Sequence, residues 1–142
     1  MNNQIGPKIR KLSRYIKHNL HQIVSEAISN QVTHVQARVL FYLEWMEEEN
    51  KNVYQKNIEE FLAVSKSTAS ELISNLENNG YIIRVKEEND GRLRKILLLE
   101  KGRETNNIIG KTFQDFEKKL QSKLTQEELE SFFNIVDKLV SE

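Results

Sequence analysis

The sequence predicts a mainly α-helical fold with one small β-hairpin. Apolar residues recur at spacings of three and four over most of the 142 residues, which is the period of amphipathic helices. The pattern changes over residues 81–99, where two short apolar segments flank a cluster of Asn, Asp and Gly, as in a β-hairpin. With 1 Pro, 5 Gly and 38% apolar residues, the composition indicates an ordered chain with a packed core.

Composition excludes several classes of protein. The absence of Cys excludes disulfides, cysteine nucleophiles, thiolate zinc sites and thiol redox sensing. No segment approaches the roughly 20 apolar residues of a transmembrane helix, and residues 1–15 lack the apolar run of a secretory signal. We therefore expect a cytoplasmic protein without a membrane partner.

The chain has no net charge, with 21 basic and 21 acidic residues, but the charges are segregated. Residues 1–30 carry a net charge of +4 and residues 81–103 a net charge of +3. The segments 31–50, 51–80 and 104–142 carry −3, −1 and −3. A local basic element on a neutral body is what an oriented contact with DNA requires.

Two helices are predicted first, over residues 5–27 and from Thr33 to a polar loop at 47–52. Pro7 lies in the first turn of the first helix, where proline is tolerated. Thr33 is a favourable cap for the second helix. The apolar stripe of the first helix consists of Ile5, Ile9, Leu12, Ile16, Leu20, Ile23 and Ala27.

A helix-turn-helix followed by a hairpin is predicted next. A short helix around residues 58–62 is separated only by Ala63 and Val64 from a second helix, which Ser65 caps and which ends at Gly80. The strands of the hairpin are predicted at Tyr81–Lys86 and Leu93–Leu99, with the turn at Glu87–Arg92. A hairpin directly after a helix-turn-helix is a wing, so the fold class is a winged helix-turn-helix core with flanking helices.

The remaining residues are predicted to be helical, with Thr125 and Glu128 forming a capping box at the start of the last helix. The apolar stripes of the terminal helices are too large for a small winged core to bury, and such stripes mark an interface. We expect a symmetric homodimer. For residues 1–142 we expect one chain in which the segments 1–30 and 104–142 are dimerisation helices and residues 31–103 form a winged helix-turn-helix core that binds DNA. The aromatic residues expected to pack in the core or interface, with no cofactor, are Phe113, Phe116, Phe132 and Phe133.

Several segments together resemble the MarR family of winged-helix transcriptional regulators, over nearly the whole chain from about Ile5 onward. VTHVQARVL (32–40) is similar to the opening of the family's second helix. VSKSTAS (64–70) and LENNGYI (76–82) resemble its recognition helix and the exit from it, and LLEKGRE (98–104) resembles the entry to the next helix. Asp90-Gly91-Arg92 matches the D-x-R motif of the family's wing. The resemblance implies a dimeric DNA-binding regulator of transcription.

The chain departs from the family's pattern at two positions. Leu99 stands where a capping Thr is usual, and the loss of such a cap costs about 1 kcal/mol. Tyr54 stands where a capping Thr is common before the third helix. A phenol does not cap in the same way, but it can reach a DNA phosphate.

The helix from Lys66 to Asn79 is expected to lie in the major groove. Hydroxyl and backbone N–H groups at its N-terminus suit phosphate, and short side chains allow a close approach. The helix contains no Arg for a bidentate contact with guanine, so we expect modest direct readout and more dependence on DNA shape. Ser67, Thr68 and Ser70 are candidate readers of base edges. The candidate DNA-binding residues of this helix are Ser65, Lys66, Ser67, Thr68, Ser70 and Asn75.

The wing supplies the arginine that the helix lacks. Arg92 at the hairpin tip can enter a narrow, electronegative minor groove. The resemblance implies that Asp90 orients Arg92 through a salt bridge. Charges on a hairpin are often only solvated, but their position after a helix-turn-helix favours DNA contact. The residues expected to hold flanking phosphates are Arg84, Lys86, Arg94 and Lys95.

The first helix also has a basic face opposite its apolar stripe, and three interpretations of it stay open. A metal site built from His18 and His21, with His34, lacks an indicated carboxylate partner. A pocket for a small aromatic or phenolic effector, a type common in the family, is the second. The third, which we favour, is a solvated basic face or one near DNA phosphates. The candidate effector residues are Arg14, His18, His21 and Trp45.

The leading hypothesis is a sequence-specific regulator that binds an inverted repeat in double-stranded DNA and acts as a repressor released by a small ligand. A ligand would change the separation of two recognition helices, which must lie about 34–36 Å apart or a multiple of that distance. The alternative is a winged-helix protein-interaction or architectural module without sequence-specific regulation. An enzyme is disfavoured, because no nucleophile motif, phosphate loop or acid–base pair is recognisable.

Overall fold

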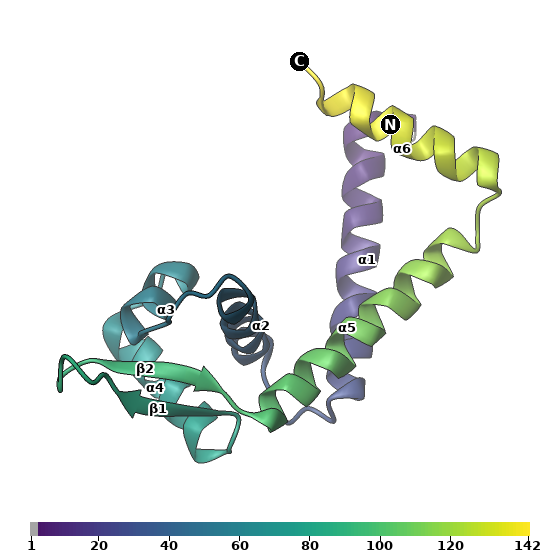
Figure 1. The fold of residues 1–142 in the computed structure, drawn as a ribbon. Coiled ribbons are helices and arrows are strands. Elements are labelled where there is room, and N and C mark those ends of the chain that lie inside the picture. Colours follow the sequence, from purple (N-terminus) through teal and green to yellow (C-terminus); the bar gives the residue numbers. More distant parts are fainter. Residues whose placement is uncertain (1–2) are drawn as a thin grey trace. The chain divides into compact units, whose positions relative to one another are not determined.

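The computed structural model describes residues 3–142 and has a mainly helical fold with one two-stranded sheet (Figure 1). This confirms the predicted fold class of helices with a small β-wing. The strands are β1 (Ile82–Lys86) and β2 (Arg94–Leu98). The helices are α1 (Ile5–Ala27), α2 (His34–Glu48), α3 (Gln55–Leu62), α4 (Lys66–Asn78), α5 (Glu100–Gln121) and α6 (Gln126–Val140).

The chain divides into two compact units. The winged unit, Ser25–Ile109, contains α2, α3, α4, the hairpin and the adjoining ends of α1 and α5. The helical unit combines the N-terminal part up to Val24 with Gly110–Glu142. No helix in the described part of the chain is both long and apolar enough to cross a membrane.

Apolar side chains from helices and hairpin form the core of the winged unit. The predicted stripe of α4 is buried at Ala69, Ile73 and Leu76, because these positions recur on one face of the helix. Ile58 of α3 is fully buried beside them in the same core. The largest fully buried side chains are Leu40, Ile58, Ile73, Leu76, Ile82 and Val39.

Side-chain caps fix where three helices begin. The hydroxyl oxygens of Thr33, Ser65 and Thr125 each accept a hydrogen bond from the backbone N–H three residues on. The predicted capping box between Thr125 and Glu128 is present. The sharp turn between α3 and α4 depends on Ala63, a non-glycine residue with a left-handed φ of 54°.

The hairpin is antiparallel, with Ile82 paired to Leu98 and Lys86 paired to Arg94. Its inner face is buried at Ile82, Ile96 and Leu98, where it covers the helices. The loop before α3 extends the sheet edge, because the Ile96 N–H donates to the carbonyl of Val53 over 2.8 Å.

The first turn of α5 lies against the base of the hairpin. A Cβ at Gly102 would lie 2.5 Å from Leu98 Cδ1 and 2.8 Å from the carbonyl oxygen of Tyr81. Only glycine therefore fits without a backbone shift, since the Tyr81 oxygen belongs to the chain itself. The close approach explains the glycine of the LLEKGRE segment.

The helical unit has little core of its own. Among its described apolar residues, only Val24 and Phe116 are buried. Lys123 lies 5.3 Å from the centre of the Tyr15 ring, which connects the turn after α5 to α1. Of the aromatic residues predicted to pack, Phe116 is buried, whereas Phe113, Phe132 and Phe133 are 49%, 39% and 46% exposed.

Candidate DNA interface

The N-terminal turn of α4 presents a cluster of hydroxyl groups at the surface. Ser65 Oγ lies 3.2 Å from Ser67 Oγ and 3.0 Å from Thr68 Oγ1, and it also accepts the Thr68 N–H. The side chains of Ser65, Ser67 and Thr68 are exposed. The free N–H groups of this helix end and the adjoining hydroxyls together suit a phosphate oxygen.

The rest of α4 presents a polar face away from the core. Ser67, Glu71 and Asn75 follow one another at intervals of four residues and are all exposed. Lys66 is exposed at the start of the helix, and Ser70 is half-buried. The six candidate residues of α4 therefore lie on or beside one accessible surface, and Ser70 is the least accessible of them.

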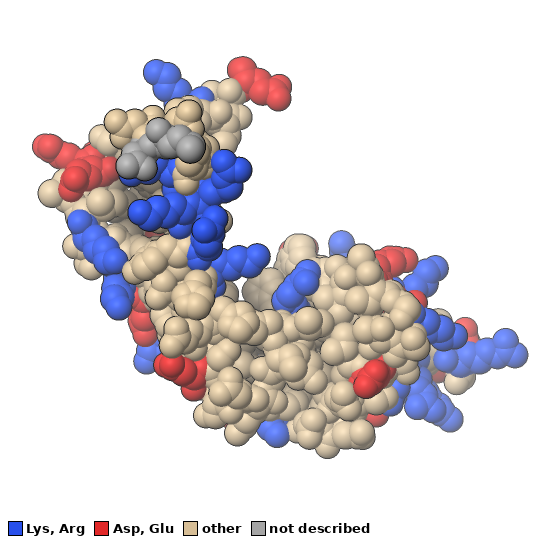
Figure 2. Space-filling model, turned by 180° about the vertical axis from the view of Figure 1, so that it is seen from behind, with Lys and Arg blue, Asp and Glu red and all other residues tan. Residues whose placement is uncertain are grey.

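Basic side chains gather on the hairpin. Figure 2 shows blue atoms clustered at the end of the winged unit that carries the hairpin. Lys86, Arg92 and Arg94 are exposed, and Lys95 is half-buried. The winged unit thus carries a hydroxyl-rich helix end and a basic hairpin on one small scaffold.

The expected salt bridge between Asp90 and Arg92 is absent from the described residues. Asp90 Oδ1 instead accepts the backbone N–H of Arg92 over 3.0 Å. The expectation was wrong because a carboxylate two residues before an N–H closes a local turn, and Asp commonly does so. Asp90 therefore shapes the hairpin tip, while the exposed guanidinium of Arg92 is not held by it.

Arg84 has an acidic partner that the sequence analysis missed. Its Nη2 lies 2.9 Å from Glu77 Oε1, its Nε also donates to that oxygen, and its backbone N–H donates to Glu77 Oε2. These hydrogen bonds from the side chain and backbone of Arg84 lower the pKa of Glu77. The role predicted for Arg84 at a DNA phosphate stays a prediction, but part of its guanidinium is already used to join α4 to β1.

Tyr54 likewise has a partner within the protein. Its phenol donates a hydrogen bond of 2.6 Å to Glu87 Oε1, and this bond is the largest cause of the raised pKa of Tyr54. A contact of this phenol with a phosphate, which the sequence allows, stays a prediction, and the sequence pattern does not reveal Glu87 as its partner. Thirty-three residues separate the two, and no pattern in the sequence connects them.

The four candidate effector residues belong to different units. Arg14, His18 and His21 lie on α1 in the helical unit, and Trp45 lies on α2 in the winged unit. Nε2 of His34 lies 3.3 Å from Ser25 Oγ. Within residues 3–142, no three His, Asp or Glu side chains are grouped as ligands for a metal ion.

Aromatic side chains cluster on the outer face of α2 and on α3. The rings of Tyr42 and Phe61 are stacked with their centres 4.3 Å apart, and Trp45 meets Tyr42 edge-on at 6.5 Å. Arg38 lies 5.4 Å from the centre of the Phe61 ring. Trp45 is 47% exposed and Phe41 is 64% exposed, so both aromatic side chains are accessible at the surface.

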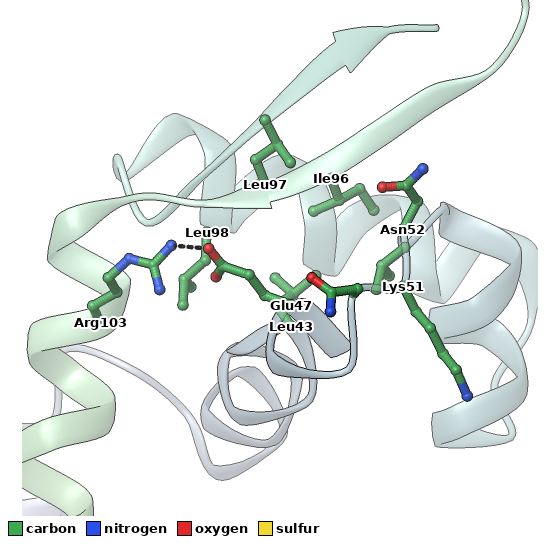
Figure 3. Close-up of a pocket in the computed structure, with 10 residues that line it drawn as sticks. Leu43, Glu47, Lys51, Asn52, Ile96, Leu97, Leu98 and Arg103 are labelled. Carbon is green, nitrogen blue, oxygen red and sulfur yellow. Dashed lines mark hydrogen bonds and ion pairs between the residues drawn. The ribbon is translucent and has the colours of Figure 1, made fainter. Parts of the chain in front are cut away.

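A cavity of about 390 Å³ lies between α2, β2 and the start of α5 (Figure 3). Leu43, Ile96 and Leu98 contribute apolar wall. At its edge, Arg103 Nη2 donates to Glu47 Oε1 over 2.7 Å. None of these residues was among the predicted site residues, because the fold brings them together from segments up to 60 residues apart in sequence, at positions 43 and 103.

The helix pair α3–α4 and the following hairpin define a winged helix-turn-helix protein. The family model described as the MarR family matches residues 30–93. A solved structure of a MepR variant from Staphylococcus aureus is similar over 96% of both chains, with 25% sequence identity and a TM-score of 0.86. The match over residues 30–93 and the likeness to MepR over nearly the whole chain support a MarR-family winged-helix transcriptional regulator.

Other solved structures are similar as well. A second MepR variant, solved bound to an oligodeoxyribonucleotide, has a TM-score of 0.74 and 26% identity over 93% of this chain and 95% of that one. A further MepR structure contains ethidium bromide. YusO from Bacillus subtilis shares the fold, with a TM-score of 0.78 and 21% identity over 98% of this chain and 96% of that one. No curated protein matches the chain by sequence.

Proposed function

We propose that this regulator binds an inverted repeat in double-stranded DNA as a homodimer and acts as a repressor that a small ligand releases. The observation that carries the proposal is the exposed hydroxyl-rich turn at Ser65–Thr68, in the same small unit as the exposed Arg92 and Arg94 of the hairpin. A helix end of this kind suits the major groove and its phosphates, and an arginine on a wing suits the minor groove. The MepR structure with an oligodeoxyribonucleotide supports DNA as the partner.

The exposed apolar surface of the helical unit supports the homodimer. Phe132, Ile135 and Leu139 are 39%, 55% and 52% exposed on one face of α6. On α1, Ile5 and Ile9 are 62% and 46% exposed. Apolar patches of this extent favour burial against a second copy, and a dimer would place two recognition helices for two half-sites.

The aromatic surface of α2 supports an aromatic ligand. Trp45 and Phe41 are four residues apart on α2 and are both about half exposed or more. Ethidium in a MepR structure is a flat aromatic ligand, which such side chains can stack against. We propose that Trp45 lines the effector site, and the effector role expected of Arg14, His18 and His21 stays a separate prediction. Trp45 is the single Trp of the chain, so quenching of its fluorescence by ethidium would test this assignment directly.

The decisive experiment is selection of binding sites from a random duplex library by the purified protein at physiological salt. An inverted repeat with half-sites about one duplex turn apart would support a dimeric operator binder. Recovery of no motif, with only weak and salt-sensitive binding, would contradict sequence-specific regulation. The winged-helix interaction or architectural module would then be the better hypothesis.

A further inference from the structure

Hydrogen bonds tie the base of the wing to the rest of the winged unit at two points. The Ile96 N–H donates to the Val53 carbonyl from β2, and Arg84 of β1 pairs with Glu77 of α4. Beyond these points the hairpin extends past the helices toward its tip (Figure 1). In the described chain, residues 88–93 make no hydrogen bond or ion pair with the helices.

The tip of the wing is held together by its own hydrogen bonds. The Glu87 N–H donates to the Leu93 carbonyl over 3.0 Å, and the Leu93 N–H donates to the Asp90 carbonyl over 3.1 Å. The Arg92 N–H donates to the Asp90 side chain. These bonds close the turn on itself and connect the tip, including Arg92, to Glu87.

Glu87 is therefore the outermost residue of the hairpin that is fixed to a helix. Its carboxylate accepts the Tyr54 hydroxyl at 2.6 Å, a length typical of a hydrogen bond to a charged oxygen. Tyr54 is itself held at the start of α3, where its backbone N–H donates to Asn57 Oδ1 over 2.9 Å. A tyrosine phenol is protonated at neutral pH and can donate there, and the hydrogen bond to Glu87 raises the pKa of Tyr54 further.

We propose that the Tyr54–Glu87 hydrogen bond sets the direction of the wing and so positions Arg92 for the minor groove. This inference rests on the proposed DNA-binding function and makes Tyr54 and Glu87 positioning residues. The bond also keeps a carboxylate turned toward α3, where it does not face phosphates alongside the basic side chains of the hairpin. A threonine at position 54 has no group long enough to make this contact.

The test is a set of dissociation constants for the duplex obtained by site selection. Tyr54→Phe removes only the hydroxyl and should weaken binding about three- to tenfold. Glu88→Ala removes the same charge as Glu87→Ala, but from the next residue, and serves as the matched control. Relative to Glu88→Ala, Glu87→Ala should weaken binding by about as much as Tyr54→Phe does. The double variant Tyr54→Phe/Glu87→Ala should bind no more weakly than either single variant, because both remove one bond.

A double-mutant experiment with Arg92 distinguishes a positioning role of Tyr54 from a general effect of Tyr54 on the stability of the protein. If Tyr54 acts by placing Arg92, adding Tyr54→Phe to Arg92→Ala should cause no further loss of affinity. A loss of the same size in both backgrounds would overturn the proposal. As a readout without DNA, backbone ¹⁵N order parameters at residues 88–93 should fall in Tyr54→Phe.

The remaining outcomes are distinguishable. Unchanged affinity and order parameters in Tyr54→Phe, with weakened binding by Arg92→Ala, would overturn this inference and leave the proposed function in place. Tighter binding by Glu87→Ala than by Glu88→Ala would also overturn it, because it would mean that the freed phenol binds a phosphate. Failure of the unmodified protein to bind any duplex would contradict the proposed function itself.

Discussion

Arg92 and Arg84 lie on the same hairpin, yet only Arg84 has an acidic partner in the described structure. Arg84 makes two side-chain hydrogen bonds to Glu77, and Arg92 contributes only its backbone N–H to a turn. An arginine that is already paired has fewer N–H donors left for a phosphate and its charge is partly balanced, whereas a solvated arginine offers all five donors. At the residue scale, this difference predicts unequal roles for the two arginines.

Arg92→Ala should weaken binding of the selected duplex by about 1–3 kcal/mol. It should also reduce the slope of the logarithm of the binding constant against the logarithm of the salt concentration by about one. The reason is that Arg92 offers an exposed guanidinium to the groove and its phosphates. Fluorescence anisotropy titrations at several salt concentrations would measure both effects. Lys138→Ala on α6 removes one positive charge far along the chain and should change neither; equal losses in both variants would indicate only a general charge effect.

Glu77→Gln should reduce the free energy of unfolding at neutral pH by about 1 kcal/mol or less, because the pair with Arg84 is partly exposed. The pKa of Glu77 is lowered from its ordinary value of 4.5 by Arg84, so the carboxylate stabilises the fold fully above that value. This contribution is lost as the pH falls below 4.5 through the lowered pKa of the folded state. Urea unfolding at pH 7 and pH 3 would measure it.

The difference between Glu77→Gln and the unmodified protein should therefore shrink at the lower pH. Glu71→Gln on the same helix, which also removes one charge, is the matched control. A difference that persists undiminished at pH 3 would show that the ion pair is not its source.

At the level of elements, Ser65 both caps α4 and belongs to the proposed DNA-contacting end of that helix. Ser65 caps the helix through the Thr68 N–H, and its hydroxyl also belongs to the cluster with Ser67. The α2 cap at Thr33 makes the same kind of bond to Gln36 but lies outside the candidate DNA interface. The two caps therefore allow helix stability and DNA contact to be measured separately.

Ser65→Ala and Thr33→Ala should each destabilise the protein by about 1 kcal/mol, as the loss of a helix cap usually does. Only Ser65→Ala should also weaken DNA binding, because it removes a hydroxyl from the helix end that we propose faces the duplex. Thermal unfolding and DNA titrations of both variants would compare the two effects. If Ser65→Ala and Thr33→Ala lost the same free energy of unfolding and bound DNA with the same affinity, Ser65 would be excluded from the interface.

At the scale of the whole molecule, the two units differ in how they bury apolar residues. The winged unit contains fourteen of the sixteen buried apolar side chains found in residues 3–142, and the helical unit only two. A unit with so little core depends on a second surface for stability, since burial of apolar area is the main favourable term in folding. This asymmetry is the physical basis for the proposed homodimer.

Leu139→Glu should shift the protein from dimer to monomer at micromolar concentration, because it places a charge on the apolar face of α6. Asn134→Glu adds the same charge on the opposite face and should leave the dimer intact. Sedimentation equilibrium would measure the masses, and circular dichroism would show whether the helices persist. An unmodified protein that sediments as a monomer would contradict the homodimer.

Local rules explain most of what the sequence predicted correctly. The caps at Thr33, Ser65 and Thr125 and the left-handed Gly80 depend on neighbours within a few residues, so their identity is visible in the sequence. The wing is visible because the apolar period changes at residue 81. The predicted strands were one residue too long at the start of β1 and at both ends of β2, because pairing stops where the partner strand ends.

Contacts between distant residues were not predictable. No sequence pattern identifies Arg84 as the partner of Glu77 or Tyr54 as the partner of Glu87. For Asp90, a salt bridge with the Arg92 side chain was predicted, but Asp90 accepts the Arg92 backbone N–H instead. The cavity beside Arg103 was missed for the same reason. Short motifs specify which residues stand near the wing, but not which of the available charges pair.

Helical periods, caps, the hairpin and the family pattern can all be recognised in the sequence, because each of them depends on residues that are close along the chain. The pairing of Tyr54 with Glu87 and of Glu77 with Arg84, and the exposure of Arg92, follow from the folded arrangement of the elements. These choices depend on the distances between charged and hydroxyl groups from different elements. Packing of the hairpin on the helices fixes those distances, and no local pattern encodes them.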